Sequence, residues 1–224
     1  MTLAHLHRSM SVGSQLALRV VDGDHDRRRV DRLRDVVVGA GFAVDTVDVD
    51  EHSIRVRAQR QRTLADTVGP GMRLLVCGLN PSLYAADAGV GYARPGNRFW
   101  PAARAVGVVE RDRDAVDALT GHGVGMTDLV KRASTGAKGL TAAEYREGAE
   151  RVERLVRWLR PGAVCFVGLA GWRAAVDAGA RAGEQAGGFG GVPAYVMPST
   201  SGANAHARLD ELADHLRAAV ALSR

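Results

Sequence analysis

The sequence is poor in the features that mark secreted, metal-binding and membrane proteins. Of 224 residues only two are cysteines, Cys77 and Cys165, and neither lies in a CxxC pair or beside a histidine. Both lie in apolar, strand-like runs, so we expect reduced core residues rather than disulfide partners or metal ligands. No apolar run reaches the length of a membrane span, and the N-terminal stretch MTLAHLHRSMSVGS lacks a signal-peptide core. We therefore expect a cytoplasmic protein without a membrane partner.

Aromatic residues are also scarce, at 5% of the chain, which makes each of them informative. Hydrophobic residues make up 46%, so a sizeable core can form, and the sequence has no repeat or low-complexity tract. The formal net charge is +5 and the sequence pI is about 9.7. This charge permits a polyanionic partner such as nucleic acid, although an arginine-rich surface is often simply a solvated one.

The first part of the chain predicts a small βαββ annex at residues 1–66. Residues 16–20 indicate a strand, residues 25–40 an amphipathic helix, and FAVDTVDVD with HSIRVRAQR a hairpin that turns at Asp50-Glu51. A Gly-Pro linker follows at residues 67–71. The annex is weakly similar to the tail of class I S-adenosylmethionine-dependent methyltransferases. Because it carries no Gly-rich cofactor loop, we expect only a structural or DNA-facing accessory role.

The second part, residues 72–224, alternates buried strands with helices. The runs RLLVCGL, GVGMTDLV, AVCFVGL and VPAYVMPSTS predict four strands. A capping box, Thr141 with Glu144, opens a helix that ends before Pro161, and its arginines are expected to form a solvated face. Strands that alternate with helices predict a parallel sheet with helices on both faces.

The loop after the first of these strands, within residues 74–100, is too long for a plain strand-to-helix connection. Long loops at the carboxyl ends of parallel strands are where α/β proteins build sites. Asn80 closes the first strand, where it can hold a water or simply form an Asx turn before Pro81. Asp128 ends the second strand, where a helper carboxylate, a helix N-cap and a contact with Lys131 are all open.

Several motifs carry a family resemblance. GLNPSLYAADAGVGYARPGNRFW resembles the first motif of the mismatch-specific uracil-DNA and thymine-DNA glycosylases, and MPSTSGANA resembles their second. GMTDLVKRAS and the stretch from Leu140 to Trp172 follow the same family, so the resemblance covers roughly residues 72–222. It implies a three-layer α/β fold with a four-stranded parallel sheet. It also implies hydrolysis of the N-glycosidic bond of a flipped uracil-type base, without metal or cofactor.

The resemblance also implies roles for individual residues. Asn80 would position the attacking water, with Thr127 near it and Asp128 as a helper. Tyr92 would stack on the extruded base, unless it only packs the loop. Backbone donors after Pro81 would form a nest for the charge on the leaving base. The implied substrate-binding residues are Gly78, Leu79, Pro81, Ser82, Leu83, Tyr92 and Asn97, where Ser82 replaces the usual Gly and Asn97 also secures the loop.

The second motif is expected to contact DNA phosphates, or else to form an exposed turn. Its residues are Ser199, Thr200, Ser201, Gly202, Ala203 and Asn204. The family usually carries a large residue after MPSTSG that fills the stack vacated by the flipped base. Ala203 occupies that position, with Asn204 and His206 as possible substitutes. We therefore expect a preference for bases that flip cheaply, in single strands or weak mismatches.

The resemblance predicts a monomeric, monofunctional glycosylase that acts on DNA containing uracil or mismatched or deaminated bases, in a bacterium at the nucleoid. Lyase chemistry is not expected, because Lys131 and Lys138 lie in loops rather than at a strand end. Two alternatives remain open. One is a catalytically weak lesion- or mismatch-binding DNA module of the same fold, and the other is a remnant methyltransferase that has lost its cofactor.

Overall fold

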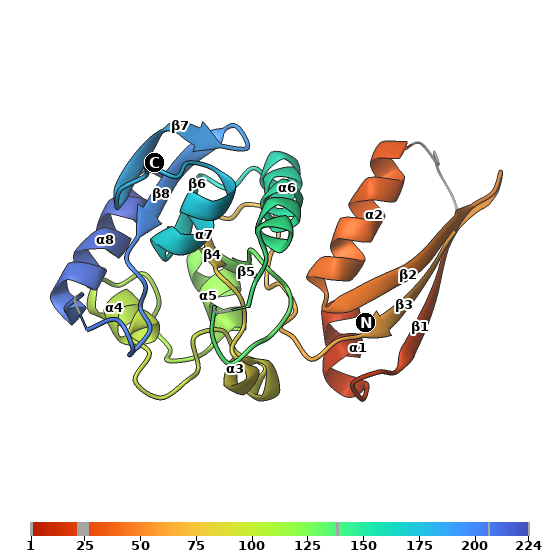
Figure 1. Ribbon diagram of the computed structural model, residues 1–224, viewed down its shortest axis with the longest axis horizontal. Helices are drawn as coiled ribbons and strands as arrows, with labels where there is room; N and C mark the ends of the chain where they lie inside the picture. The colour runs from red at the N-terminus through yellow and green to blue at the C-terminus, as the bar shows by residue number, and fades with distance from the viewer. Residues whose placement is uncertain (1, 22–26, 138, 206, 224) are drawn as a thin grey trace.

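The computed structural model describes residues 2–21, 27–137, 139–205 and 207–223. Figure 1 shows two sheets, each with its own helices, joined by a short segment. The first sheet belongs to the annex. The annex elements are α1 (Leu3–Ser9), β1 (Gln15–Val21), α2 (Arg27–Gly39), β2 (Phe42–Val49) and β3 (Ser53–Arg60).

The annex sheet is antiparallel, in the order β1-β3-β2, and packs one face on a core that includes Val37, Phe42 and Ile54. The hairpin turns where it was expected, because Asp50 Oδ1 accepts hydrogen bonds from the amides of His52 (2.9 Å) and Ser53 (2.7 Å). The strand β1 and the helix α2 are confirmed; residues 25 and 26 of the expected helix lie outside the described residues. Helix α1 was not predicted.

The second sheet, in the α/β domain, has the order β5-β4-β6-β8-β7. The first four of these strands run parallel, as expected, and β7 pairs antiparallel with β8. The domain elements are β4 (Leu74–Gly78), α3 (Leu83–Ala88), α4 (Phe99–Ala105), α5 (Ala115–His122), β5 (Val124–Asp128), α6 (Ala142–Leu159), β6 (Ala163–Val167), α7 (Leu169–Ala175), β7 (Gly183–Phe189), β8 (Val192–Met197) and α8 (Leu209–Ala221).

The expected four-stranded sheet is thus one strand too small. The missed strand β7, GEQAGGF, is rich in glycine and carries few apolar residues, so it has no strand-like pattern. It forms because its backbone pairs with β8 at the edge of the sheet, where one exposed face is tolerated.

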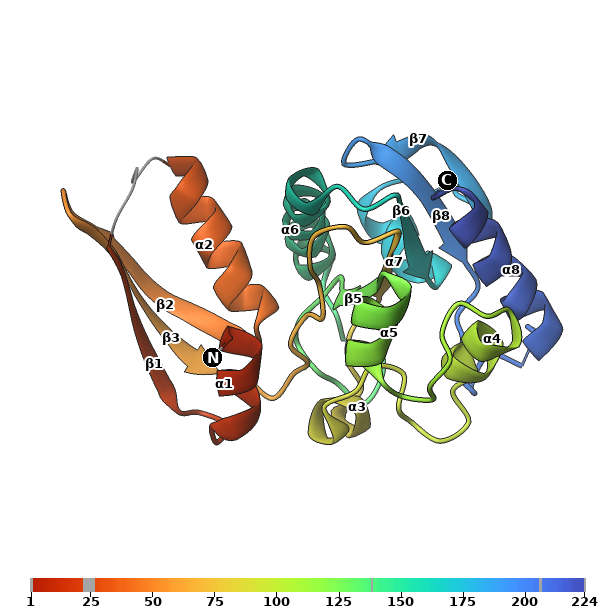
Figure 2. The same ribbon diagram turned by 180° about the vertical axis from the view of Figure 1, so that it is seen from behind.

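The α/β domain has three layers. Helices α4, α5 and α8 cover one face of the sheet, and α6 and α7 cover the other (Figures 1 and 2). The strand β4 supplies both cores by alternation, with Leu74 and Val76 in the first and Leu75 and Cys77 in the second. Cys77 and Cys165 are buried free thiols, as expected. Among the described helices, none combines the length and the apolar character that crossing a bilayer requires.

The joining segment, residues 61–73 between β3 and β4, makes contacts with the α/β domain. Thr63 Oγ1 donates to the carbonyl of Lys131, and Thr67 forms an isolated bridge with Met126 of β5. Helix α2 lies between the annex sheet and α6 in both views, where Asp35 pairs with Arg154 at 2.7 Å. The joining segment is therefore part of the packed structure and not a free tether.

Candidate functional site

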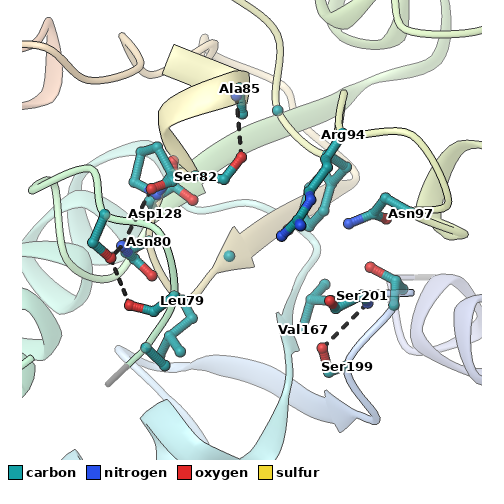
Figure 3. Close-up of a pocket in the computed structure, with 18 of the residues that line it drawn as sticks. Leu79, Asn80, Ser82, Ala85, Arg94, Asn97, Asp128, Val167, Ser199 and Ser201 are labelled. Atoms are coloured by element: carbon teal, nitrogen blue, oxygen red, sulfur yellow. Dashed lines mark hydrogen bonds between the residues drawn. The ribbon is translucent and has the colours of Figure 1, made fainter. Parts of the chain in front are cut away.

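A cavity of about 470 Å³ opens at the carboxyl ends of β4, β5, β6 and β8, within the size range of small-molecule sites. Figure 3 shows Asn80 and Asp128 on one side of it and Arg94 and Asn97 on the other. Most of the expected site residues line this cavity. They are Gly78, Leu79, Asn80, Pro81, Ser82, Tyr92, Asn97, Asp128, Ser199, Thr200, Ser201, Ala203 and Asn204. Thr127, Leu83 and Gly202 are not among its lining residues.

The side chain of Asn80 is held in one orientation. Its Nδ2 donates to the carbonyl of Arg132 at 3.0 Å, to Ser134 Oγ at 2.8 Å and to its own neighbour Pro81 at 3.2 Å. These bonds assign the amide nitrogen to the protein, so only Oδ1 is left to face a water. The expectation that this amide both accepts from and donates to a water is thus corrected: it is an acceptor.

Asp128 lies at the end of β5, directly beside Gly78 of β4. No helix begins there, so the N-cap alternative is wrong, and Lys131 does not bond the Asp128 carboxylate but turns to Asp66. A Cβ at Gly78 would stand 2.5 Å from Asp128 Oδ1, so only glycine leaves room for the carboxylate. Burial, opposed by the charges of Lys131 and Arg151, raises the pKa of Asp128 to about 6.

Tyr92 forms part of the cavity wall with a strained backbone, at φ 58°, a region that non-glycine residues seldom occupy. Its ring stacks on Phe99, with centroids 4.2 Å apart and planes 21° apart. The Tyr92 hydroxyl is buried and has no hydrogen-bond partner in the described part of the chain. Phe99 therefore covers one face of the ring, and the hydroxyl makes no hydrogen bond to a described residue.

Behind the cavity lies a buried ion-pair cluster that the sequence did not predict, which we call the Asp66 cluster. Asp66 receives Lys131 Nζ at 2.7 Å, Arg151 Nη1 at 2.9 Å and the hydroxyl of Thr127 at 2.8 Å. This corrects two expectations. Thr127 serves the cluster instead of a water in the cavity, and Arg151, only 5% exposed, is not part of a solvated face. Successive residues of a strand point to opposite faces of the sheet, so the side chains of Thr127 and Asp128 cannot lie on the same face.

The expected backbone nest after Pro81 is corrected at one of its donors, Leu83. Ser82 is the N-cap of α3, with its Oγ accepting from the amide of Ala85 at 3.1 Å. The amide of Leu83 donates to the carbonyl of Ser134 at 3.3 Å, so it is not free to receive an oxyanion. The long loop thus contains a short helix, and the amide of Leu83 drops out of the expected nest.

The second motif, at residues 199–204, lines the cavity after β8 and is held by hydrogen bonds from Arg98. The Arg98 guanidinium donates to the carbonyls of Ser201 (3.0 Å), Asn204 (2.6 Å) and Ala207. Thr200 is only 1% exposed, so its hydroxyl cannot contact a phosphate, which corrects that expectation. Ser199 and Ser201 are partly exposed. Gly202 is required for close approach, since a Cβ there would stand 2.9 Å from the carbonyl oxygen of Gly96.

The expected wedge position is exposed and small. Ala203 lies on the surface, and the Asn204 side chain turns back to donate to the carbonyl of Ser199 at 2.8 Å. Asn204 therefore does not replace the missing large residue, which corrects one alternative. His206, the other, lies outside the described residues, as does Lys138.

Two donors point into the cavity from the loop 91–97. Arg94, which was not predicted, extends its guanidinium inward and has no partner among the described residues (Figure 3). Asn97 accepts the amide of Phe99 at 3.0 Å, so it secures α4 as expected and leaves its Nδ2 facing the cavity. The sequence held a signal for Arg94, since it is the only charged residue between Asp87 and Arg98. No group of three or more His, Cys, Asp or Glu side chains in the described structure is placed to hold a metal.

A protein-family model matches the part of the chain that contains this cavity. The model of the uracil DNA glycosylase superfamily matches residues 65–221. This range covers nearly all of the α/β domain and the part of the joining segment that carries Asp66 and Thr67. Members of this superfamily are in general DNA glycosylases, hydrolases that act in base excision repair. The match takes in every cavity-lining residue except Leu64. The chain therefore belongs to the uracil DNA glycosylase superfamily.

Proposed function

We propose that the protein is a monomeric, monofunctional DNA glycosylase that removes uracil, and other deaminated or mismatched bases, from DNA. One observation carries this proposal: Asn80 and Asp128, which follow or end the adjacent strands β4 and β5, line the same side of one cavity. Asn80 Oδ1 and the Asp128 carboxylate are both acceptors, and together they can hold one water with its protons directed at them. A base must leave the duplex before an enzyme reaches its sugar bond, and the cavity provides the receiving volume.

The reaction needs one bond to form and one to break. The water oxygen attacks C1′ of the sugar while the bond from C1′ to the base nitrogen breaks, and its electron pair leaves with the base. The water proton passes to the Asp128 carboxylate, and the base anion is protonated by solvent. A pKa of about 6 keeps Asp128 ionised near neutral pH and still basic enough to accept this proton.

The opposite side of the cavity suits the departing base. The free face of the Tyr92 ring can stack on it, since Phe99 occupies the other face. The Arg94 guanidinium and Asn97 Nδ2 are donors aimed at the volume where the base oxygens would lie. They add to the backbone donors expected after Pro81, because a positive donor stabilises the charge that develops on the leaving base.

Asn80→Ala is the direct test. We expect it to lose most of the single-turnover excision rate on a uracil-containing oligonucleotide while it still binds that DNA, because the water loses an acceptor but the base keeps its pocket. Gln185→Ala, which removes an amide near the sheet edge far from the cavity, is the matched control. Wild-type excision by Asn80→Ala would refute the role of Asn80.

A catalytically weak lesion-binding module is the second candidate, and the exposed, small Ala203 favours it. Without a wedge, a flipped base in paired DNA is less populated. A gel assay that combines binding with alkali cleavage of abasic sites separates the two functions. Binding without abasic product, for single-stranded as well as duplex uracil, would establish the binding module.

A further inference from the structure

We propose that Asp66 is a positioning residue for Asp128, and that the annex acts on catalysis by holding Asp66 in place. The inference rests on the proposed function, in which Asp128 accepts the proton of the attacking water. Asp66 itself does not touch the cavity. Its effect would pass through the Asp66 cluster, which lies between the annex and the strand that carries Asp128.

Both carboxylate oxygens of Asp66 accept hydrogen bonds within the cluster. The Asp66, Lys131 and Arg151 side chains are only 6%, 12% and 6% exposed, so their pairing is not screened by solvent. Arg151 uses both terminal nitrogens: Nη1 donates to Asp66 Oδ2 at 2.9 Å, and Nη2 donates to Thr127 Oγ1 at 3.0 Å and to the Asp128 carbonyl at 2.8 Å. The cluster thus grips the backbone on which the Asp128 carboxylate stands.

The annex closes the cluster from the other side. The Asp66 amide donates to the carbonyl of Gly39 at the end of α2, at 2.7 Å. A Cβ on Gly39 would stand 2.5 Å from Asp66 Oδ2, so the helix end lies directly against the carboxylate. The annex therefore contributes a wall of the cluster, and this gives it a defined part in the site although it lies outside the cavity.

The charges around Asp128 determine what removal of Asp66 would do. The groups facing Asp128 are Lys131 and Arg151, which favour its ionised form, Asp66, which disfavours it, and the neutral Tyr92 hydroxyl and Cys77 thiol. The carboxylate accepts no hydrogen bond from the described residues, so these charges and burial decide its protonation. Loss of Asp66 leaves two cations beside Asp128 without their counter-ion, whereas loss of Lys131 removes one of them.

The experiment is the pH dependence of single-turnover excision for Asp66→Asn, Lys131→Met and the double variant. We expect the acid limb of the profile to move to lower pH in Asp66→Asn and to higher pH in Lys131→Met, each by about 1 unit, the lower end for a close charge. The double variant, which loses one charge of each sign, should return toward the wild-type position. A purely structural role would lower the rates or the melting temperature without moving the limb in opposite directions.

Asp35→Asn is the matched control. Asp35 also joins α2 to an α6 arginine, Arg154, but this pair is not among the groups that act on Asp128. Its limb should coincide with that of the wild type. The inference is overturned if the limbs of Asp66→Asn and Lys131→Met stay in place or move in the same direction. The double variant and Lys131→Met decide the matter if Asp66→Asn does not fold.

Carboxyl carbon NMR titration of Asp128, assigned with Asp128→Asn, gives a second readout that needs no turnover. A wild-type protein without excision activity would refute the proposed function. The opposite displacements of the Asp128 titration would still test the Asp66 cluster in that case. Displacements that are absent or of one sign would overturn the inference while leaving an observed excision activity intact.

Discussion

The polar side chains at the ends of β4 and β5 differ from those of the loop 91–97, on the opposite side of the cavity, in how they are held. On the strand side, Asn80 Nδ2 makes three hydrogen bonds, and the Asp128 backbone is gripped by the Asp66 cluster. On the loop side, Arg94 and Asn97 present donors that face the cavity and have no acceptor among the described residues. The polar groups of the strand side are held by the protein itself, whereas the donors of loop 91–97 are left to bind a substrate.

This difference matches two tasks. A group that handles a water and a proton must stand in place beforehand, because reorganisation during the reaction raises the barrier. A group that recognises an entering base can instead exchange solvent for the base, so exposure costs it little. The strand side is therefore expected to govern the rate and the loop side to govern capture, and four substitutions test that division.

The largest effect is expected for Asp128→Asn, which keeps the shape of the side chain but cannot accept the proton. General-base catalysis contributes about 10²–10⁴-fold, so the single-turnover rate should fall within this range. Because the pKa of Asp128 is raised to about 6, the protonated form prevails below that pH, and wild-type activity should fall as the pH drops through about 6. The variant should lack this limb. A normal rate with an unchanged limb would contradict the role of the strand side.

Tyr92→Ala should come next, by weakening capture of the extruded base. Stacking on an aromatic ring contributes about 1–3 kcal/mol per base. Tyr92→Phe should be nearly silent, because the Tyr92 hydroxyl has no partner in the described structure. Binding of an uncleavable uracil analogue in DNA measures both. If the two variants were equally impaired, the hydroxyl rather than the ring face would be the important group.

Arg94→Met is expected to have a smaller effect, since Arg94 is exposed and its charge is screened. A loss of about 1 kcal/mol, below the roughly 1.5–3 kcal/mol of a hydrogen bond to a charged group because Arg94 is exposed, would reduce the excision rate roughly fivefold. The loss should be greater for bases that leave poorly. Arg19→Met, which removes the same charge from the exposed annex sheet, is the control. Equal losses in the two variants would reduce Arg94 to a general electrostatic contribution.

The smallest effect, and a gain, is expected for Ala203→Arg. A large side chain there would fill the vacated stack and offset part of the unstacking cost of about a few kcal/mol, so duplex uracil should be excised a few times faster. Single-stranded uracil, which needs no wedge, should change less. Ala17→Arg adds the same side chain to the annex surface as a control. An equal gain on single and double strands would show that added charge, and not a wedge, is responsible.

Patterns in the sequence were sufficient where local chemistry decides the structure. The apolar runs predicted the four parallel strands, and the Thr141–Glu144 capping box was found as expected at the start of α6. The strand β7 and the helix α3 escaped for opposite reasons. Pairing with β8 stabilises a glycine-rich segment that has little strand propensity of its own, and one serine cap converts part of a loop into a helix.

For the site, the sequence by itself determined that Asn80 and Asp128 end neighbouring strands and that a long loop carries Tyr92, because parallel strands present their carboxyl ends at one edge. Only the tertiary structure decided which atoms face the cavity. The pleat of β5 turns Thr127 away from the cavity and toward Asp66. The amide nitrogen of Asn80 donates to Ser134 Oγ, 54 residues along the chain, and so is not available to the cavity. Asp66 meets Arg151 across 85 residues. Such pairings depend on how helices and strands pack, which no local pattern of residues encodes.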